Sequence, residues 1–146
     1  MRTVLMSVKP KWVEKIASGE KRWEFRRSRV GFPEGTSVLV YRSGKSGAVV
    51  GRFSAGHILR SRDPATLLFS LGWYNVTSRA DPAVEQYLDG ARSVSAIEVI
   101  HYRPIEPVTL VELRRRIPGF RPPQSYQFWD GDTTPLLASE WEAPNG

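Results

Sequence analysis

The sequence predicts an α+β domain, a small and mostly antiparallel β-barrel with short peripheral helices. Its 146 residues are enough for one domain with a single hydrophobic core, which we expect to span residues 1–146. The 12 glycines and 11 prolines indicate frequent turns and short elements. Strand-like and helix-like segments mix along the chain without the regular βαβ alternation that is typical of a parallel sheet.

Segments rich in β-branched and aromatic residues mark the strands. We expect strands at 3–8, 22–27, 37–42, 48–54, 93–103 and 125–129. Residues 43–47 have the composition of a hairpin connection, and residues 56–60 extend the fourth strand past a bend at Gly56. Pro104 and Pro107 are expected to end the fifth strand, because proline cannot donate a hydrogen bond to a sheet.

Proline and capping residues mark the helices. Pro10 begins a helix over 10–18, and its apolar face carries Trp12 and Ile16, which we expect to be largely buried. The other expected helices are 64–71 after the cap Asp63, 82–89 after the cap Asp81, one after the capping box Thr109–Glu112 and a short one from Thr134.

Composition excludes several classes of protein. The sequence has no cysteine, which excludes a disulfide scaffold and a thiolate nucleophile. No apolar run approaches the roughly 18 residues that span a bilayer, and Lys9 and Lys11 interrupt the apolar stretch near the N-terminus. We therefore expect a cytoplasmic protein with no membrane partner.

Metal and phosphate-loop motifs are incomplete in this sequence. His57 and His101 are the only histidines, and their separation matches no metal-ligand motif, so we expect no metal and no cofactor. Gly44-Lys45-Ser46 resembles the end of a phosphate-binding loop, but Leu39 stands where that motif requires glycine. A flexible turn with an exposed lysine is the simpler explanation.

The charge is divided unevenly between the two halves of the chain. Residues 1–62 contain 14 Lys and Arg against 4 Asp and Glu, whereas residues 63–146 contain 7 against 11. Sixteen of the 21 cations are arginine, the side chain that binds phosphate bidentately and stacks on bases. This distribution favours a polyanion-binding face and therefore a nucleic-acid or nucleotide partner.

The strongest candidate for a site is the segment GEKRWEFRR. Alternation along a strand puts Glu24 and Arg26 on one face, and Lys21 reaches the same spot from the preceding turn. We expect Trp23 and Phe25 to fill the barrel, so that the polar face looks outward. A carboxylate between two cations stays ionised and holds both cations in place. From spacing alone, a salt-bridged strand face and a ligand site both remain open.

This segment resembles the opening of ASCH domains, a branch of the PUA-like superfamily. Their signature is G-x-K-x-x-E-x-R, and it is matched by Gly19, Lys21, Glu24 and Arg26. VLMSVKP resembles the family's first strand, EQYLDG followed by SAIEV resembles a later helix-strand step, and PPQSYQF resembles a closing motif. The likeness covers most of residues 3–129. It implies a PUA-like β-barrel with a cleft beside the motif, where family members are proposed to bind RNA or modified nucleobases.

The resemblance also implies several activities. Many members carry the label of transcriptional regulator, which implies a regulatory role. One branch resembles amidohydrolases of N4-acetylcytidine, which use a lysine, a threonine three residues later and a distant glutamate. Lys21 matches that lysine, Glu24 replaces the threonine, and Glu85 is a rough match for the glutamate. Other members are described as ribonucleases.

Two functions remain open from the sequence. The first is a binding module for RNA, a nucleotide or a modified nucleoside, in which the basic half holds phosphates. The second is a hydrolase acting on a modified nucleoside or on RNA, with Lys21 and Glu24 as catalytic residues. The expected ligand-binding residues are Lys9, Lys21, Glu24, Arg26, Tyr41 and Tyr126, with Trp23 as a further candidate for stacking on a base.

Overall fold

The computed structural model describes residues 2–72 and 82–138. Its strands are β1 (Thr3–Val8), β2 (Trp23–Arg26), β3 (Ser37–Arg42), β4 (Ala48–Ser61), β5 (Val94–Thr109) and β6 (Tyr126–Trp129). Its helices are α1 (Pro10–Ala17), α2 (Pro64–Leu71), α3 (Pro82–Leu88), α4 (Leu110–Arg116) and the 3-10 helix η3 (Thr134–Leu136). The α+β class and the order of the expected elements are thereby confirmed.

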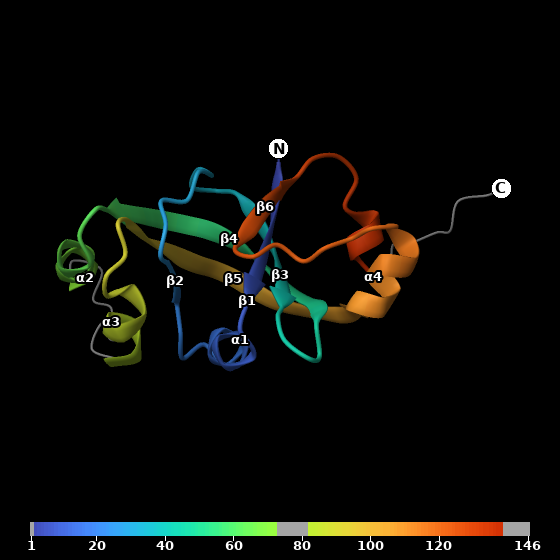
Figure 1. Ribbon diagram of the computed structural model, residues 1–146, viewed down its shortest axis with the longest axis horizontal. Coiled ribbons are helices and arrows are strands. Elements are labelled where there is room, and N and C mark those ends of the chain that lie inside the picture. Colours follow the sequence, from blue (N-terminus) through green and yellow to red (C-terminus); the bar gives the residue numbers. More distant parts are fainter. Residues whose placement is uncertain (1, 73–81, 139–146) are drawn as a thin grey trace.

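The six strands form one mixed sheet in the order β2-β5-β4-β3-β1-β6. β1 runs parallel to β3, and the other four pairings are antiparallel. Figure 1 shows the long strands β4 and β5 extending along the molecule, with α2 and α3 at one end, α4 at the other and α1 beneath the middle. The prediction of a mostly antiparallel sheet with peripheral helices is correct.

The sheet curls but does not close. β2 and β6 are its two edges, and within the described residues they do not pair with each other. Instead, Arg26 on β2 donates from Nη2 to the carbonyl oxygen of Ser7 on β1 at 2.7 Å, and its Nη1 lies 3.4 Å from the hydroxyl of Ser125, next to β6. The predicted barrel is therefore open, and the side chain of Arg26 bridges the seam between β2 and β1.

Three apolar clusters hold the helices on the sheet. One lies inside the curve of the sheet and includes Val13 and Ile16 of α1. A second lies on the opposite face, beneath α4 and η3. The third joins β2 to α2 and α3 through Trp23 and Phe25. Because β1 and β3 contribute to the first two clusters on alternate residues, both faces of these central strands are buried.

Local sequence signals explain the helix starts. The Asp63 carboxylate accepts from the backbone amides of Ala65 and Thr66, and the Thr109 hydroxyl accepts from the amide of Glu112. Both expected caps are therefore present. Asp81, the third expected cap, lies outside the described residues. No helix in the described part of the chain is long and apolar enough to cross a membrane.

The expected end of β5 is wrong. The strand runs through Pro104 and Pro107 to Thr109, well beyond the predicted end at residue 103. β2 pairs only with residues 95–98 of β5, so beyond Val99 this strand has a partner on one side, β4, and its other side is an edge. Proline is tolerated at such an edge because no neighbour needs its missing N–H.

Candidate functional site

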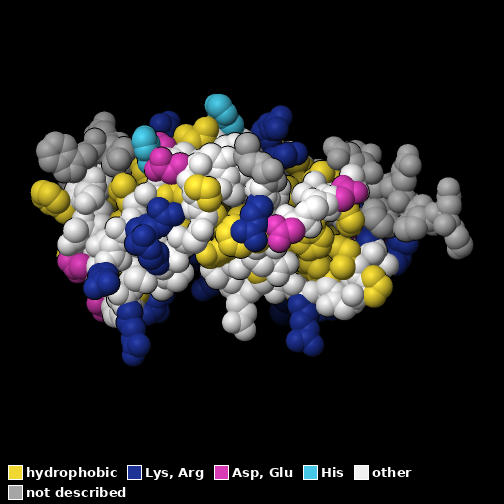
Figure 2. All heavy atoms as spheres, turned by 90° about the horizontal axis from the view of Figure 1, so that it is seen from above, with side chains coloured by type: hydrophobic (Ala, Val, Ile, Leu, Met, Phe, Trp, Pro, Cys, Tyr) yellow, Lys and Arg dark blue, Asp and Glu magenta, His cyan; other side chains and the backbone are white. Residues whose placement is uncertain are grey.

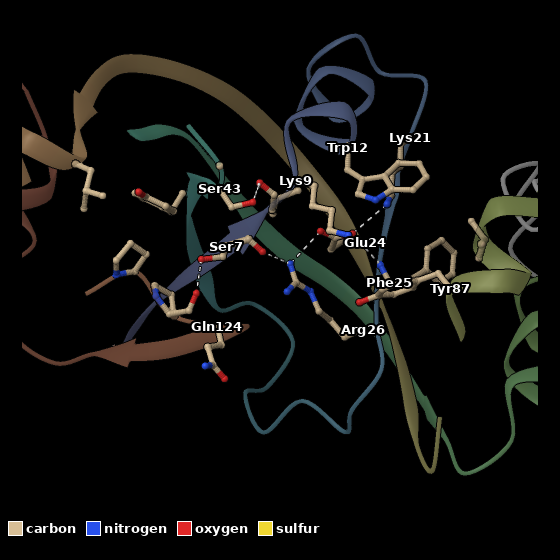
Figure 3. Close-up of a pocket in the computed structure, with 17 residues that line it drawn as sticks. Ser7, Lys9, Trp12, Lys21, Glu24, Phe25, Arg26, Ser43, Tyr87 and Gln124 are labelled. Carbon is tan, nitrogen blue, oxygen red and sulfur yellow. Dashed lines mark hydrogen bonds and ion pairs between the residues drawn. The ribbon is translucent and has the colours of Figure 1, made fainter. Parts of the chain in front are cut away.

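A pocket of about 450 Å³ opens where the C-terminal ends of β1 and β3 meet α1 and β2. We call it the main pocket. Five of the predicted site residues line it, and Figure 3 shows several of them converging from different elements. These five are Lys9, Lys21, Glu24, Arg26 and Tyr41. The structure thus brings together side chains that are up to 32 positions apart in the sequence, from Lys9 to Tyr41.

The floor of the main pocket is a buried ion triad formed by Lys21, Glu24 and Arg26. The Lys21 ammonium lies 3.0 Å from Glu24 Oε1, and the Arg26 guanidinium lies 3.1 Å from Glu24 Oε2. The Phe25 amide also donates to Oε1 at 3.0 Å. All three charged residues are 7% exposed or less. The triad is therefore an interior charge cluster, and not the exposed strand face that spacing alone left open.

Glu24 is held in its charged form. Burial by itself raises the pKa of this carboxyl, but the charges of Lys21 and Arg26 outweigh it, aided by hydrogen bonds from Lys21 and the Phe25 amide. The net result is a pKa below the ordinary value. A carboxylate of this kind is a strong hydrogen-bond acceptor and a weak base.

The direction of the β2 side chains differs from the expectation. Trp23 and Phe25 do not fill the inside of the curved sheet; they pack against α2 and α3 in the third cluster. Glu24 and Arg26 consequently face inward, toward β1 and α1. All four residues of β2 are buried, so both faces of this strand are covered.

Trp12 forms a wall of the main pocket and packs against the first cluster, but it is only partly buried, contrary to the expectation that it would be largely buried. Its ring has ammonium groups around it: the Nζ atoms of Lys21, Lys11 and Lys15 lie 4.2, 4.5 and 5.3 Å from its centroid. These distances are within the range of cation–π attraction. Ile16, its neighbour on the helix, is buried as expected.

Tyr41 also lines the main pocket. Burial raises the pKa of its phenol above the ordinary value, although the charge of Arg114 opposes this shift. The hydroxyl therefore stays protonated. Gly47 makes room for this ring, because a Cβ at that position would collide with the Tyr41 hydroxyl. Tyr87 of α3 also lines the pocket, and burial raises the pKa of its phenol too.

Two predicted aromatic residues lie elsewhere, and so does the rough match to the distant glutamate. Tyr126 is not among the lining residues; its ring packs edge-on against Phe32, and its hydroxyl accepts from the Gly31 amide at 2.8 Å. Trp23 is buried beneath α2 and α3. Glu85 is exposed on α3 and does not line the main pocket.

The sequence did not single out several lining residues. Ser7, Ser43 and Gln124 bring hydroxyl and amide groups to the pocket, and the Ser7 hydroxyl donates to the Pro123 carbonyl oxygen at 2.6 Å. Only the stretch PPQSYQF carried a signal for this side, through its likeness to a closing motif. Among the described residues, no three His, Cys, Asp or Glu side chains are grouped as metal ligands.

Comparisons with known proteins found similar sequences and folds. No family model matches the sequence. A curated relative, the ASCH domain-containing ribonuclease of Zymomonas mobilis, is 28% identical over 142 residues, covering 94% of this chain and 91% of that protein. The crystal structure of ASCH from Zymomonas mobilis matches the fold with a TM-score of 0.72 at 24% identity, covering 87% of each chain. A mutant of that protein matches with a TM-score of 0.71 at 22% identity over 88% of this chain and 91% of its own. With the complete G-x-K-x-x-E-x-R signature at the floor of the main pocket, this chain is similar to ASCH domain proteins in sequence and in fold.

Proposed function

We propose that this chain binds RNA and holds one nucleobase in the main pocket, beside Lys21 and Glu24. The observation that carries the proposal is the buried triad at the floor of an open pocket with an aromatic wall. Flat apolar walls and a few fixed polar groups are the usual features of a site for a small planar ligand. Sequence-specific RNA recognition typically uses such sites for unstacked bases.

The triad offers both an acceptor and donors to a base. Glu24 Oε1 already accepts from Lys21 and from the Phe25 amide, whereas Oε2 accepts only from Arg26. Since a carboxylate oxygen has two lone pairs, Oε2 retains capacity for an exocyclic amine. The Lys21 ammonium has three N–H donors, so it has a donor for a carbonyl oxygen or ring nitrogen of the base. This pairing suits the amino and carbonyl edge of a nucleobase.

Trp12 supplies a stacking surface, and basic side chains supply contacts to phosphate. Lys11, Lys15 and Lys21 surround the Trp12 ring, and Lys9 is exposed at the mouth of the pocket. The lysines around Trp12 match the combination of aromatic platform and positive surface that binds single strands. The face away from α1, seen from above in Figure 2, also carries Lys and Arg side chains, together with Asp and Glu side chains.

A fluorescently labelled single-stranded RNA tests this function by anisotropy. Stacking on an aromatic ring contributes about 1–3 kcal/mol per base. Trp12→Ala is therefore expected to weaken binding by about 5- to 150-fold. The matched control is Phe69→Ala, because Phe69 is 70% exposed on α2 and does not line the pocket. Equal affinities for folded Trp12→Ala, the control and the wild type would place the base elsewhere.

A second candidate is RNA cleavage, favoured by the relative that is named a ribonuclease. Cleavage without a cofactor proceeds when the 2′ oxygen attacks phosphorus and the bond to the 5′ oxygen breaks, leaving a 2′,3′-cyclic phosphate. The 2′ hydroxyl gives its proton to solvent water, and the leaving 5′ oxygen takes one from the Tyr41 phenol, which the raised pKa keeps protonated before the step. Solvent then returns a proton to the phenolate. Glu24 suits the role of base poorly, because its pKa is lowered.

Gel analysis of end-labelled RNA separates the two candidates. If the chain is a ribonuclease, Tyr41→Phe keeps the ring and the affinity for RNA but loses the proton donor, so cleavage falls about 100-fold or more. Release of acetate from N4-acetylcytidine tests amidohydrolase activity in parallel. Binding without any turnover of either substrate identifies a binding module, whereas turnover that is unchanged in Tyr41→Phe removes Tyr41 as the acid.

A further inference from the structure

A second cavity lies away from the main pocket, on strands β3, β4 and β5. Its volume is about 410 Å³, and its lining residues are Ser37, Arg52, Phe53, Ser54, His101 and Arg103. We call it the basic groove. It contains two guanidinium groups, an imidazole and two hydroxyls, and no acidic side chain lines it. Every one of these polar groups is able to donate a hydrogen bond.

The two arginines of the basic groove lie opposite each other in the sheet. Arg52 on β4 is directly opposite Arg103 on β5 in the strand register. Like charges at opposed positions in a sheet repel each other. Within residues 2–72 and 82–138, no ion pair or side-chain hydrogen bond is recorded for either guanidinium. An oxyanion between them converts this repulsion into two attractive contacts, because guanidinium groups bind phosphate bidentately.

A β-bulge turns a third basic residue into the same groove. Between Arg52 and Ser54 on β4, the partner strand β5 advances by one extra residue, from Arg103 to Ile100. His101 lies within this bulge at φ 54°, and it is the one described non-glycine residue with a positive φ. Bulges re-aim side chains, and they are frequent beside functional sites. Here the bulge brings His101 and Arg103 to one cavity.

The basic groove lies on the same face of β3 as part of the main pocket. Ser37 lines the groove and Tyr41 lines the main pocket, and side chains of a strand at odd-numbered positions share a face. Ser37 and Tyr41 are four positions apart, about 13 Å at roughly 3.3 Å per residue. Leu39 lies between them on this face and is buried in the second cluster beneath α4 and η3, so a strand that joins the two cavities passes around this cluster. Binding sites of about 4–16 nucleotides are usual for small RNA- and DNA-binding barrels, and a strand of that length reaches from the main pocket around this cluster to the basic groove.

We propose that the basic groove binds a backbone phosphate of the RNA whose base occupies the main pocket. Arg52 and Arg103 hold the phosphate oxygens, and His101 and the two serines complete the set of donors. This inference rests on the proposed RNA-binding function. It extends that function from the binding of one base to the binding of a longer strand, so that the affinity depends on the length of the RNA.

The test compares Arg52→Gln/Arg103→Gln with the control Arg62→Gln/Arg92→Gln. Both variants lose two positive charges, and the control residues are exposed and line neither cavity. The probes are a mononucleotide, a single-stranded RNA of about 12 nucleotides and inorganic phosphate. Anisotropy follows the RNA between about 50 and 200 mM salt, and the NMR signals of the His101 imidazole follow phosphate.

We expect the Arg52/Arg103 variant to bind the long RNA about tenfold more weakly than the control, with mononucleotide affinity unchanged. Its slope of log K against log salt is expected to be smaller by about 0.7, the value for one phosphate on a single strand. If the wild type binds the mononucleotide but the variant and the control bind the long RNA with equal affinity, the groove proposal is refuted and the proposed function stands. If the wild type binds neither RNA probe, the proposed function fails and the RNA role of the groove fails with it. A phosphate-induced shift of His101 signals in that case identifies a site for a free anion.

Discussion

Replacement of Glu24 by glutamine is the sharpest test of the buried triad. In the wild type one carboxylate compensates two cations, Lys21 at 3.0 Å and Arg26 at 3.1 Å. Glutamine keeps the shape of the side chain but removes the charge. Its carbonyl oxygen can replace only one carboxylate oxygen, so the amide N–H group meets a donor of Lys21 or Arg26. Both cations then remain buried, mutually repulsive and short of acceptors.

The expected cost of Glu24→Gln follows from this burial. Removing one partner of a buried ion pair typically costs about 3–5 kcal/mol, in contrast to about 0–1 kcal/mol for an exposed pair. For a domain of this size, each kcal/mol lowers Tm by about 2–4 °C. We therefore expect a fall in Tm of about 6–20 °C. Denaturant unfolding followed by tryptophan fluorescence gives the free energy of unfolding directly, and Glu20→Gln, at an exposed position, is the control.

The pH dependence of this loss has a definite sign. The pKa of Glu24 in the folded protein lies below the 4.5 that it has when unfolded. The carboxylate therefore stabilises the fold fully above about pH 4.5, and this contribution disappears as the pH falls through the lower, folded pKa. The difference between wild type and Glu24→Gln is expected to shrink over that acidic range. A difference below about 1 kcal/mol at neutral pH would refute the reasoning.

A triple replacement separates the structural role of the triad from its role in binding. In Lys21→Met/Glu24→Leu/Arg26→Met all three charges are gone, so no buried charge lacks a partner. Replacing buried ion clusters by apolar side chains is often neutral or stabilising. We expect the triple variant to unfold less readily than Glu24→Gln and yet to lose RNA binding. A stable triple variant with normal affinity would mean that the triad only supports the fold.

Three further predictions concern other parts of the molecule. Gly51→Ala is expected to destabilise the protein by about 1–3 kcal/mol in denaturant unfolding, because the new Cβ collides with the Tyr102 ring. His101→Val is expected to lower stability by about 1–2 kcal/mol while His101→Gly is near neutral, since β-branched residues are strained at positive φ. In an NMR titration, the Glu112 carboxyl is expected to titrate at a pKa of about 2 because Arg115 and Arg116 donate to it, and Arg115→Gln moves the midpoint up. A normal Glu112 midpoint, equal stability of the two His101 variants or a harmless Gly51→Ala would each contradict its prediction.

Most of the fold was predictable because its signals are local. Asp63 and Thr109 cap helices through contacts two or three residues away, and alternation correctly put Glu24 and Arg26 on one face. The end of β5 was not predictable, because tolerance of Pro104 depends on which neighbours the strand has. The sequence pattern of a strand is the same whether it lies at an edge or in the centre.

The composition of the site was predictable in part, and its orientation was not. A period of two identifies two faces of β2 but does not say which faces inward, because both are covered. Trp12 is a similar case. The apolar stripe of α1 predicts that its side chain is buried, but part of that stripe forms a wall of the main pocket. The lysines on either side of Trp12 were the sequence signal that this ring is not fully buried. The basic groove depends on a β-bulge around His101, and no local sequence pattern predicts that bulge.

The position of Arg26 couples the seam between β2 and β1 to the floor of the main pocket. This one guanidinium reaches the carbonyl oxygen of Ser7, the hydroxyl of Ser125 and the carboxylate of Glu24. Its Nε is buried and has no acceptor among the described residues, so one donor of this group is left without a hydrogen bond. A ligand that engages Glu24 or Arg26 thus changes how firmly β2 is tied to β1 and β6. Amide hydrogen exchange at the seam becomes a direct gauge of binding, even for ligands that carry no label.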